Sequence, residues 1–222
     1  MLHPAKFIRL DTETWERKEY FDYFYNQIKC KYTLNADLDI SKLLESIRMF
    51  KLKFFPSFLY VIMRSINQNK EFRMSFDNEG NLGYWNYVIP SYTIFHEDTK
   101  TFSDIWSDYN EDFSLFYQGV CHDMETYKHV KKIKARPEQP ANFCSISSLP
   151  WLSFTGYNQD TYTESSFLFP LIRFGKYHTI GEKTLIPFAV FVNHAVADGY
   201  HTAKLINDIQ EIINEPKEWM NI

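Results

Sequence analysis

The apolar positions near the end of the chain change their spacing at one point. Residues 184–192 (TLIPFAVFV) are rich in β-forming side chains and are long enough for a largely buried strand. Asn193 ends this run, and residues 200–214 (YHTAKLINDIQEIIN) follow with apolar side chains at helical spacing. The pattern therefore predicts a core strand, a short loop and a helix in this order.

Three more segments have apolar residues at helical spacing. They are residues 39–50, residues 54–69 and residues 101–127. Asp39 and Ser41 are candidate caps for the first of these helices, because their side chains can accept hydrogen bonds from the first backbone N–H groups.

The remaining apolar segments are short and are typical of strands. Residues 72–95 read as strand, turn, strand and strand, and the sequence DNEG makes the first turn. Further strands are expected at residues 143–147, 151–155 and 167–175. Because helices and strands mix without strict alternation, we expect an α+β fold with a mixed sheet, in a single domain over residues 1–222.

Composition narrows the class of protein. The 222 residues are 45% hydrophobic and carry a net charge of −4, and only residues 128–134 (KHVKKIK) are locally basic, which argues against nucleic-acid binding. There is no apolar signal-peptide core and no run of 18 apolar residues, so we expect a soluble, cytoplasmic protein with no membrane partner. The three cysteines, Cys30, Cys121 and Cys144, lack metal or redox spacing and are expected to be buried free thiols.

His194 and Asp198 are the first candidates for chemistry. A neutral imidazole is a good general base near neutral pH, and a carboxylate four residues later could orient it. The pattern alone also fits a structural histidine followed by an Asp-Gly turn. No nucleophile elbow, phosphate loop, dinucleotide fingerprint or zinc motif is present, and His194 and His201 have no nearby third ligand, so no metal is expected.

The stretch NHAVADGYH, residues 193–201, closely resembles the H-H-A-V-C-D-G-[FY]-H signature of chloramphenicol acetyltransferases. Further similar blocks run through the chain in order: WERKEYFDYF, KFFPSFLY, NKEFRM, LGYW, YTIFHEDTKTFSDIWS, SLPWLSF and FGKY. The resemblance implies a two-layer α+β sandwich, with a mixed β-sheet covered by helices. It also implies a homotrimer with its active sites at the subunit interfaces.

The resemblance assigns roles to four residues. His194 is the general base that takes a proton from a hydroxyl acceptor, and the hydroxyl then attacks acetyl-CoA directly. Ser147 matches the serine that stabilises the oxyanion, although neighbouring Ser148 leaves the register open by one residue. Asp198 is implied to pair with Arg17 and to hold the active-site loop, rather than to orient His194.

The resemblance also implies two binding sites, with acetyl-CoA as cosubstrate and no permanently bound cofactor. The positions that match CoA-binding residues are Lys53, Trp151, Lys176 and Tyr177. The positions that match the acceptor pocket are Phe24, Ile28, Phe102, Tyr157, Gln159, Thr161 and Arg173.

The last three acceptor positions depart from the family pattern. Gln159 and Thr161 replace apolar residues, and Arg173 replaces a threonine. Two acceptors therefore stay open: chloramphenicol, or a more polar or anionic hydroxyl compound. Two other interpretations of the whole protein are considered. One is the catalytic domain of a dihydrolipoamide acyltransferase, which the missing lipoyl segment disfavours. The other is a binding protein without catalysis.

Overall fold

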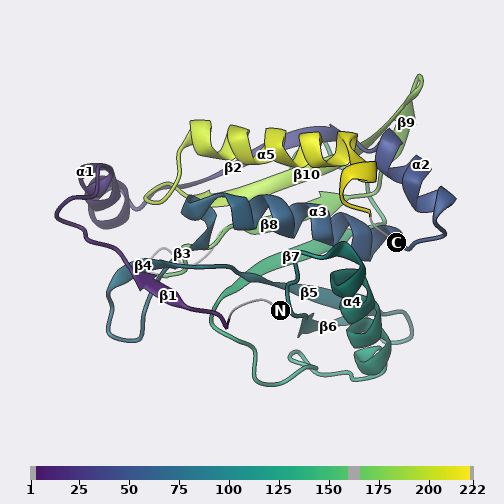
Figure 1. Ribbon diagram of the computed structural model, residues 1–222, viewed down its shortest axis with the longest axis horizontal. Helices are drawn as coiled ribbons and strands as arrows, with labels where there is room; N and C mark the ends of the chain where they lie inside the picture. Colours follow the sequence, from purple (N-terminus) through teal and green to yellow (C-terminus); the bar gives the residue numbers. More distant parts are fainter. Residues whose placement is uncertain (1–3, 160–165, 221–222) are drawn as a thin grey trace.

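The computed structural model describes residues 4–159 and 166–220 and is built around a seven-stranded mixed sheet (Figure 1). In spatial order the strands are β2 (Lys31–Asp39), β10 (Lys183–Asn193), β8 (Leu171–Gly175), β7 (Phe143–Leu149), β5 (Ile89–His96) and β6 (Thr101–Trp106), with β9 (His178–Ile180) paired to β10. Strand β7 runs parallel to β5 and β8, and the other neighbours are antiparallel. The predicted α+β class with a mixed sheet is confirmed.

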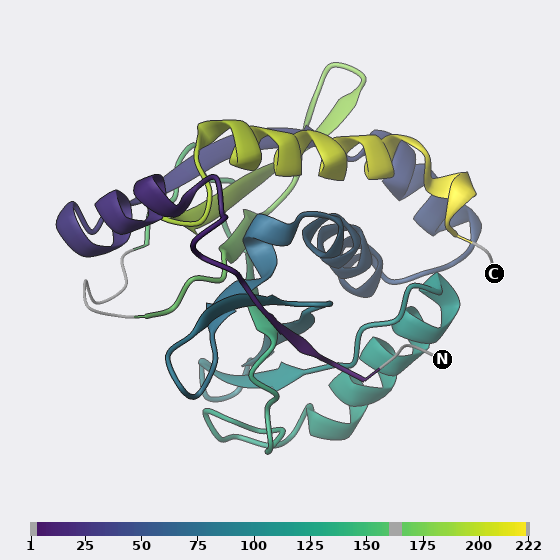
Figure 2. The same ribbon diagram turned by 60° about the vertical axis from the view of Figure 1, so that its left-hand side comes forward.

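The remaining elements flank this sheet. A small antiparallel sheet contains β1 (Phe7–Arg9), β4 (Leu82–Trp85) and β3 (Met74–Phe76). The α-helices are α1 (Lys18–Asp22), α2 (Ser41–Met49), α3 (Phe54–Gln68), α4 (Phe113–Tyr127) and α5 (Gly199–Asn214). The short helical segments are η1 (Tyr23–Gln27), η2 (Lys70–Arg73) and η3 (Pro216–Glu218). Figure 2 shows α1 and η1 projecting from one end of the molecule.

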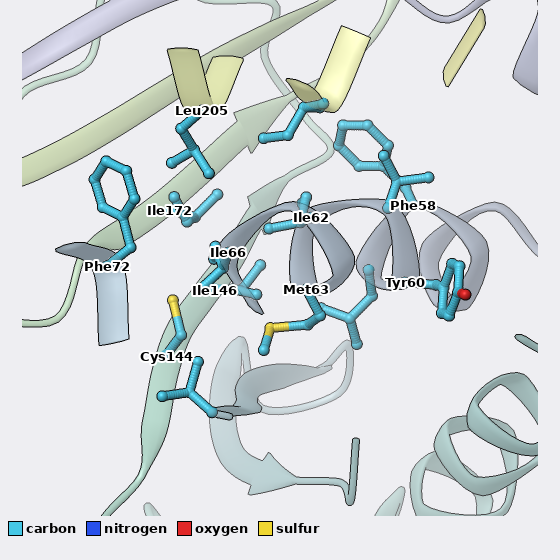
Figure 3. Close-up of a cluster of buried hydrophobic side chains, with 14 of the residues drawn as sticks. Phe58, Tyr60, Ile62, Met63, Ile66, Phe72, Cys144, Ile146, Ile172 and Leu205 are labelled. Carbon is cyan, nitrogen blue, oxygen red and sulfur yellow. The ribbon is translucent and has the colours of Figure 1, made fainter. Parts of the chain in front are cut away.

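Helix α3 fills the core against one face of the large sheet. The ring of Phe58 lies 5.0 Å from that of Phe174 on β8 and 6.3 Å from that of Phe188 on β10. Figure 3 shows how Leu205 of α5 and Ile172 of β8 pack around the same helix. Burial of this large apolar surface is the main force that holds the helices on the sheet.

The opposite face of the large sheet, called the outer face below, carries the site residues. Alternation along the strands puts Ser147 of β7 and Arg173 of β8 on this face, while Ile146 and Ile172 point into the core. Irregular segments lie over part of the outer face. For example, the backbone N–H of Tyr157 donates to Asn35 Oδ1 on β2, 2.9 Å away.

The elements with the strongest periodicity agree with the sequence prediction. The predicted helices at 54–69 and 200–214 correspond to α3 and α5, and the strand at 184–192 lies within β10. The helix at 39–50 corresponds to α2, which begins at Ser41. The side chain of Asp39 accepts a hydrogen bond from the backbone N–H of Ser41, so it acts just before the helix.

The predicted helix at 101–127 is wrong in its first part. Residues 101–106 form strand β6, and the helix begins only at Phe113, where the Asp112 side chain caps it by accepting from the N–H of Leu115. Ser103 and Ile105 are buried while Phe102 is exposed, which is the period of two that a strand requires. Pairing with β5 selected this period over the helical one.

Two predicted strands are also corrected. Residues 151–155 are irregular, because the Leu152 carbonyl accepts from the Lys176 N–H at the end of β8 instead of entering a strand ladder. The strand expected at 167–175 begins only at Leu171. Pro170 precedes it and has no N–H for a ladder hydrogen bond.

The three cysteines are free, but only Cys144 is buried; Cys30 and Cys121 are partly exposed. Burial raises the pKa of the Cys144 thiol to about 12, so this side chain acts as an unreactive apolar group.

Charges in the basic segment 128–134 are balanced locally. Lys131 pairs with Asp98, and Lys134 pairs with Asp104 at 3.0 Å. Within residues 4–159 and 166–220, no helix is long and apolar enough to cross a membrane. The same ranges hold no group of three or more His, Cys, Asp and Glu side chains arranged for a metal ion.

Candidate active site

His194 lies immediately after the last residue of β10. Its backbone N–H donates to the Cys30 carbonyl at 3.0 Å, which extends the β2–β10 ladder by one step. The chain then turns sharply, because the Asn193 side chain accepts from the Ala195 N–H at 3.1 Å. The buried strand thus fixes the backbone of His194. The turn that follows leads the chain away from the His194 side chain.

Two aromatic rings hold the imidazole in place. Phe24 of η1 stacks on it with ring centroids 3.7 Å apart and an interplanar angle of 12°. Tyr32 of β2 meets it edge-on at 5.2 Å, and the Tyr32 hydroxyl lies 2.6 Å from the Thr202 hydroxyl of α5. The ring is half-buried, and its Nδ1 atom is buried without a hydrogen-bond partner among the described residues. The imidazole is therefore oriented by packing on both sides.

Asp198 ties the histidine loop to the N-terminal segment. Its Oδ2 accepts from Arg17 Nη1 at 2.9 Å, and its Oδ1 lies 2.8 Å from His201 Nδ1 and accepts from the Tyr200 N–H at 3.0 Å. Asp198 and His201 also form a capping box at the start of α5. These contacts go to Arg17, Tyr200 and His201 rather than to His194. The resemblance implies the contact with Arg17, and a structural role for Asp198 stays a prediction.

The pKa of Asp198 reflects this arrangement. Partial burial opposes its ionisation, but the hydrogen bonds from Arg17 and His201 and the positive charge beside it outweigh burial and lower the pKa to about 2. The ionised carboxylate is therefore the form that stabilises the loop.

We expect the substitution Asp198→Asn to lower the free energy of unfolding by about 1 kcal/mol at neutral pH, since a partly exposed ion pair contributes about this much. The folded-state pKa lies below the ordinary value of 3.8, so this contribution is present above pH 3.8 and is lost as the pH falls toward about 2. Urea unfolding over a pH series will check it: the difference from the wild type should shrink at acid pH. Arg17→Gln should behave in the same way, and a difference independent of pH would contradict this account.

Ser147 lies on the outer face within a row of polar side chains. The strand registers align it with Arg173 on β8, and Arg173 with Ala189 on β10. On its other side, the Thr93 hydroxyl of β5 is 3.0 Å from the Ser147 hydroxyl. If Thr93 donates this hydrogen bond, the hydrogen of Ser147 is free to point toward a bound group.

Ser147 and His194 of one chain are far apart. Ser147 is level with Ala189, and His194 follows Ala189 by five residues on β10, so the two lie roughly 17 Å apart along the strands and about 10 Å apart across them. They cannot act on one small molecule within a single chain.

The four predicted CoA-binding residues gather at one end of the sheet. The Tyr177 ring lies 5.6 Å from that of Phe54, the residue that follows Lys53. The Lys176 N–H donates to Leu152, the residue that follows Trp151. Lys53, Lys176, Tyr177 and Trp151 are all exposed. They lie at the end of β8 that is opposite to the His194 end of the neighbouring β10.

The predicted acceptor residues fall into separate groups. Phe24 and Ile28 belong to the His194 end, and Ile28 is 52% exposed. Phe102 is exposed on β6 and faces Phe95, whose ring lies 4.6 Å from that of Trp151. Tyr157 and Gln159 lie near β2, and their side chains hydrogen-bond to each other at 3.4 Å. Arg173 lies beside Ser147, and Thr161 is outside the described residues.

Sequence reasoning missed three residues of this site. Thr93 and Tyr32 reach the site through strand pairing and packing, and no local pattern marks them. His201 did have a signal, because it stands three residues after the capping Asp198, where a capping-box partner belongs.

Solved structures of acyltransferases share this arrangement of a mixed sheet with helices packed on one face. The dihydrolipoamide acetyltransferase of Azotobacter vinelandii shares this fold, with a TM-score of 0.67 and 15% identity over 91% of this chain and 88% of that chain. A solved chloramphenicol acetyltransferase structure superimposes with a TM-score of 0.83 and 21% identity, over 94% of this chain and all of the other.

Sequence similarity is more specific than the fold. The family model described as chloramphenicol acetyltransferase matches residues 5–210. The chain is 41% identical to the chloramphenicol acetyltransferase of Clostridium butyricum, over 95% of this chain and 96% of that protein. It is 37% identical to a chloramphenicol acetyltransferase of Staphylococcus aureus, over 96% of this chain and 99% of that protein. The chain therefore belongs to the chloramphenicol acetyltransferase family, a family of acyltransferases.

Proposed function

We propose that the protein transfers the acetyl group of acetyl-CoA to a hydroxyl group of chloramphenicol, and so confers resistance to this antibiotic. The observation that carries the proposal is the family match over nearly the whole chain, together with a histidine fixed at the end of a core strand. Acetyl-CoA is a cosubstrate here, and the reaction needs no permanently bound cofactor.

The proposed mechanism uses the thioester as an activated acyl donor. His194 takes the proton of the acceptor hydroxyl, and the hydroxyl oxygen attacks the acetyl carbonyl without an acyl-enzyme. Ser147 donates a hydrogen bond to the tetrahedral oxyanion. The intermediate then collapses, the CoA thiolate leaves, and the proton on His194 returns to the sulfur.

We infer that each active site combines two chains in a homotrimer. The support is the separation of Ser147 from His194 within one chain. A contact between the Ser147 face of one chain and the His194 end of the next is heterologous, and the smallest closed ring that such a contact can form is a trimer. The exposed apolar side chains of Phe102, Trp151 and Leu152 fit burial in this contact.

The two predicted binding sites fit this assembly. Lys53 and Lys176 suit the phosphates of CoA, and the rings of Trp151 and Tyr177 suit its adenine and pantetheine portions. Phe24, Ile28, Phe102 and Tyr157 offer apolar and aromatic surface for the acceptor. Three free thiols and the use of acetyl-CoA fit a cytoplasmic location.

Release of free CoA from acetyl-CoA tests the proposed function. We expect release to depend on chloramphenicol, and mass spectrometry of the product should show one added acetyl group. Acetyl-CoA alone is the control for background hydrolysis. A folded protein that binds acetyl-CoA but releases no CoA upon addition of chloramphenicol would overturn chloramphenicol as the acceptor.

A further inference from the structure

Arg173 is a cation on the outer face that has no counter-charge among the described residues. Its side chain is half-buried on β8, and no carboxylate lies within ion-pair distance of it in the part of the chain that the structure describes. Two other cations of the chain differ in this respect. Arg136 pairs with Asp123 at 2.6 Å, and Lys134 pairs with Asp104. Because a half-buried charge is costly without a partner, Arg173 is suited to pairing with a bound anion.

The guanidinium of Arg173 is held by main-chain groups along one side only. Its Nη1 donates to the Ile172 carbonyl at 2.8 Å and to the Ser145 carbonyl at 3.3 Å. Nε and Nη2 make no hydrogen bond among the described residues, and neither is a buried orphan. These two donors form one edge of the guanidinium, and such an edge matches the two oxygens of a carboxylate.

The position of Arg173 relates it to the reacting atoms. Its Cα is the register partner of Ser147, on the same face of two adjacent parallel strands. The carbonyls of Ser145 and Ile172, which accept from its guanidinium, come before the level of Ser147 on their strands. The charged group is therefore displaced from Ser147 by one to two residues, roughly 3–7 Å, toward the start of β7. A group bound to this guanidinium would therefore lie away from the Ser147 hydroxyl, on the side of the start of β7. On its other side the row continues with Ala189, which has a short side chain.

We propose that Arg173 binds a carboxylate on the hydroxyl acceptor, and that the protein prefers carboxylate-bearing acceptors over neutral ones. This inference rests on the proposed acetyl transfer and on Ser147 as part of the site. Chloramphenicol is neutral, so it is an acceptor that leaves Arg173 unpaired. The carboxylate lies a few bonds from the hydroxyl that is acetylated, as the displacement of the guanidinium requires.

A matched pair of acceptors tests the preference. The amine of the chloramphenicol scaffold is acylated with a dicarboxylic acid, which leaves a free carboxylate, and the control compound carries the primary amide in its place. We prepare the pair with oxalyl, succinyl and glutaryl chains to cover the expected reach. We expect kcat/KM for the best acid to exceed that of its amide at least tenfold, as a charge-assisted bidentate contact would give.

Substitutions at Arg173 assign the preference to this side chain. Arg173→Gln retains hydrogen-bond donors but loses the charge, and it should bring the acid-to-amide ratio near one while the affinity for acetyl-CoA is unchanged. Arg173→Lys keeps the charge without the planar edge and should retain part of the ratio. If no acid of the three lengths is preferred by the wild type, in turnover or in binding, the proposal is overturned.

Calorimetric binding of the same pair without acetyl-CoA separates this inference from the proposed function. Acid binding that is lost in Arg173→Gln, without acetylation of any acceptor, would support the carboxylate site and reject the acetyltransferase. Turnover of chloramphenicol without any preference for the acids would support the acetyltransferase and reject the carboxylate site. Arg173→Gln could instead weaken the oligomer and leave acceptor preference unchanged. In that case a carboxylate of another subunit is the partner of Arg173, and the proposal fails.

Discussion

The substitution His194→Ala is expected to lower kcat for chloramphenicol acetylation by on the order of 10²–10⁴-fold, the usual contribution of a general base. The physical reason is that no other base among residues 4–159 and 166–220 is positioned in its place. Phe24 and Tyr32, which flank the imidazole, are aromatic, and Asp198 is engaged with Arg17, Tyr200 and His201. Initial rates of CoA release will measure the loss.

Two controls show whether the loss of activity comes from misfolding or from removal of any histidine. The alanine leaves a gap against the Phe24 ring, so thermal unfolding and acetyl-CoA binding of the variant must be compared with those of the wild type. His122→Ala removes an exposed histidine from α4 and should leave the rate unchanged. If a folded His194→Ala protein keeps more than about a tenth of the wild-type kcat, the role of His194 as general base is wrong.

The second large effect is recovery of activity when two inactive variants are mixed. Ser147→Ala should lose about 10²–10³-fold in kcat, because it lacks the oxyanion donor. If a site takes His194 from one chain and Ser147 from the next, oligomers that form from equal amounts of His194→Ala and Ser147→Ala chains contain some intact sites. Random assembly in a cyclic ring makes about one quarter of the sites intact, so about a quarter of the wild-type activity should return.

Co-expression with two different affinity tags gives the mixed oligomers, and light scattering should give three times the 26.6 kDa mass of the chain. The separately purified variants, mixed without reassembly, are the control and should stay inactive. If the co-expressed oligomers show no more activity than these, then Ser147 and His194 do not act together across chains. The roughly 17 Å separation along the strands would then need another explanation.

Local sequence patterns predicted the elements that pack most tightly. Helix α3 and strand β10 are surrounded by apolar neighbours, so their apolar periodicity carries a strong signal. Residues 101–106 show the limit of this reasoning. Their apolar positions also fit a helix, and only hydrogen bonding to β5 made them a strand.

Only some of the site residues could be predicted, because local patterns do not report pairing between distant segments. His194 and Asp198 stand in one short motif, and a local signal exists for both. The ion pair between Asp198 and Arg17 joins residues 181 positions apart, and the contact between Thr93 and Ser147 joins residues 54 positions apart. The family resemblance indicated the first pair, and nothing in the sequence indicated the second.

Local sequence patterns specify the core strand that delivers His194 and the helix that follows it. They also indicate the family and show that the common nucleophile, phosphate-loop and zinc motifs are absent. The placement of Ser147 in a row with Thr93 and Arg173, out of reach of His194 in the same chain, depends on strand pairing. The physical reason is that local spacing fixes which way a side chain faces, whereas strand order and register fix its neighbours. Order and register arise from packing of the whole chain, and no short segment encodes them.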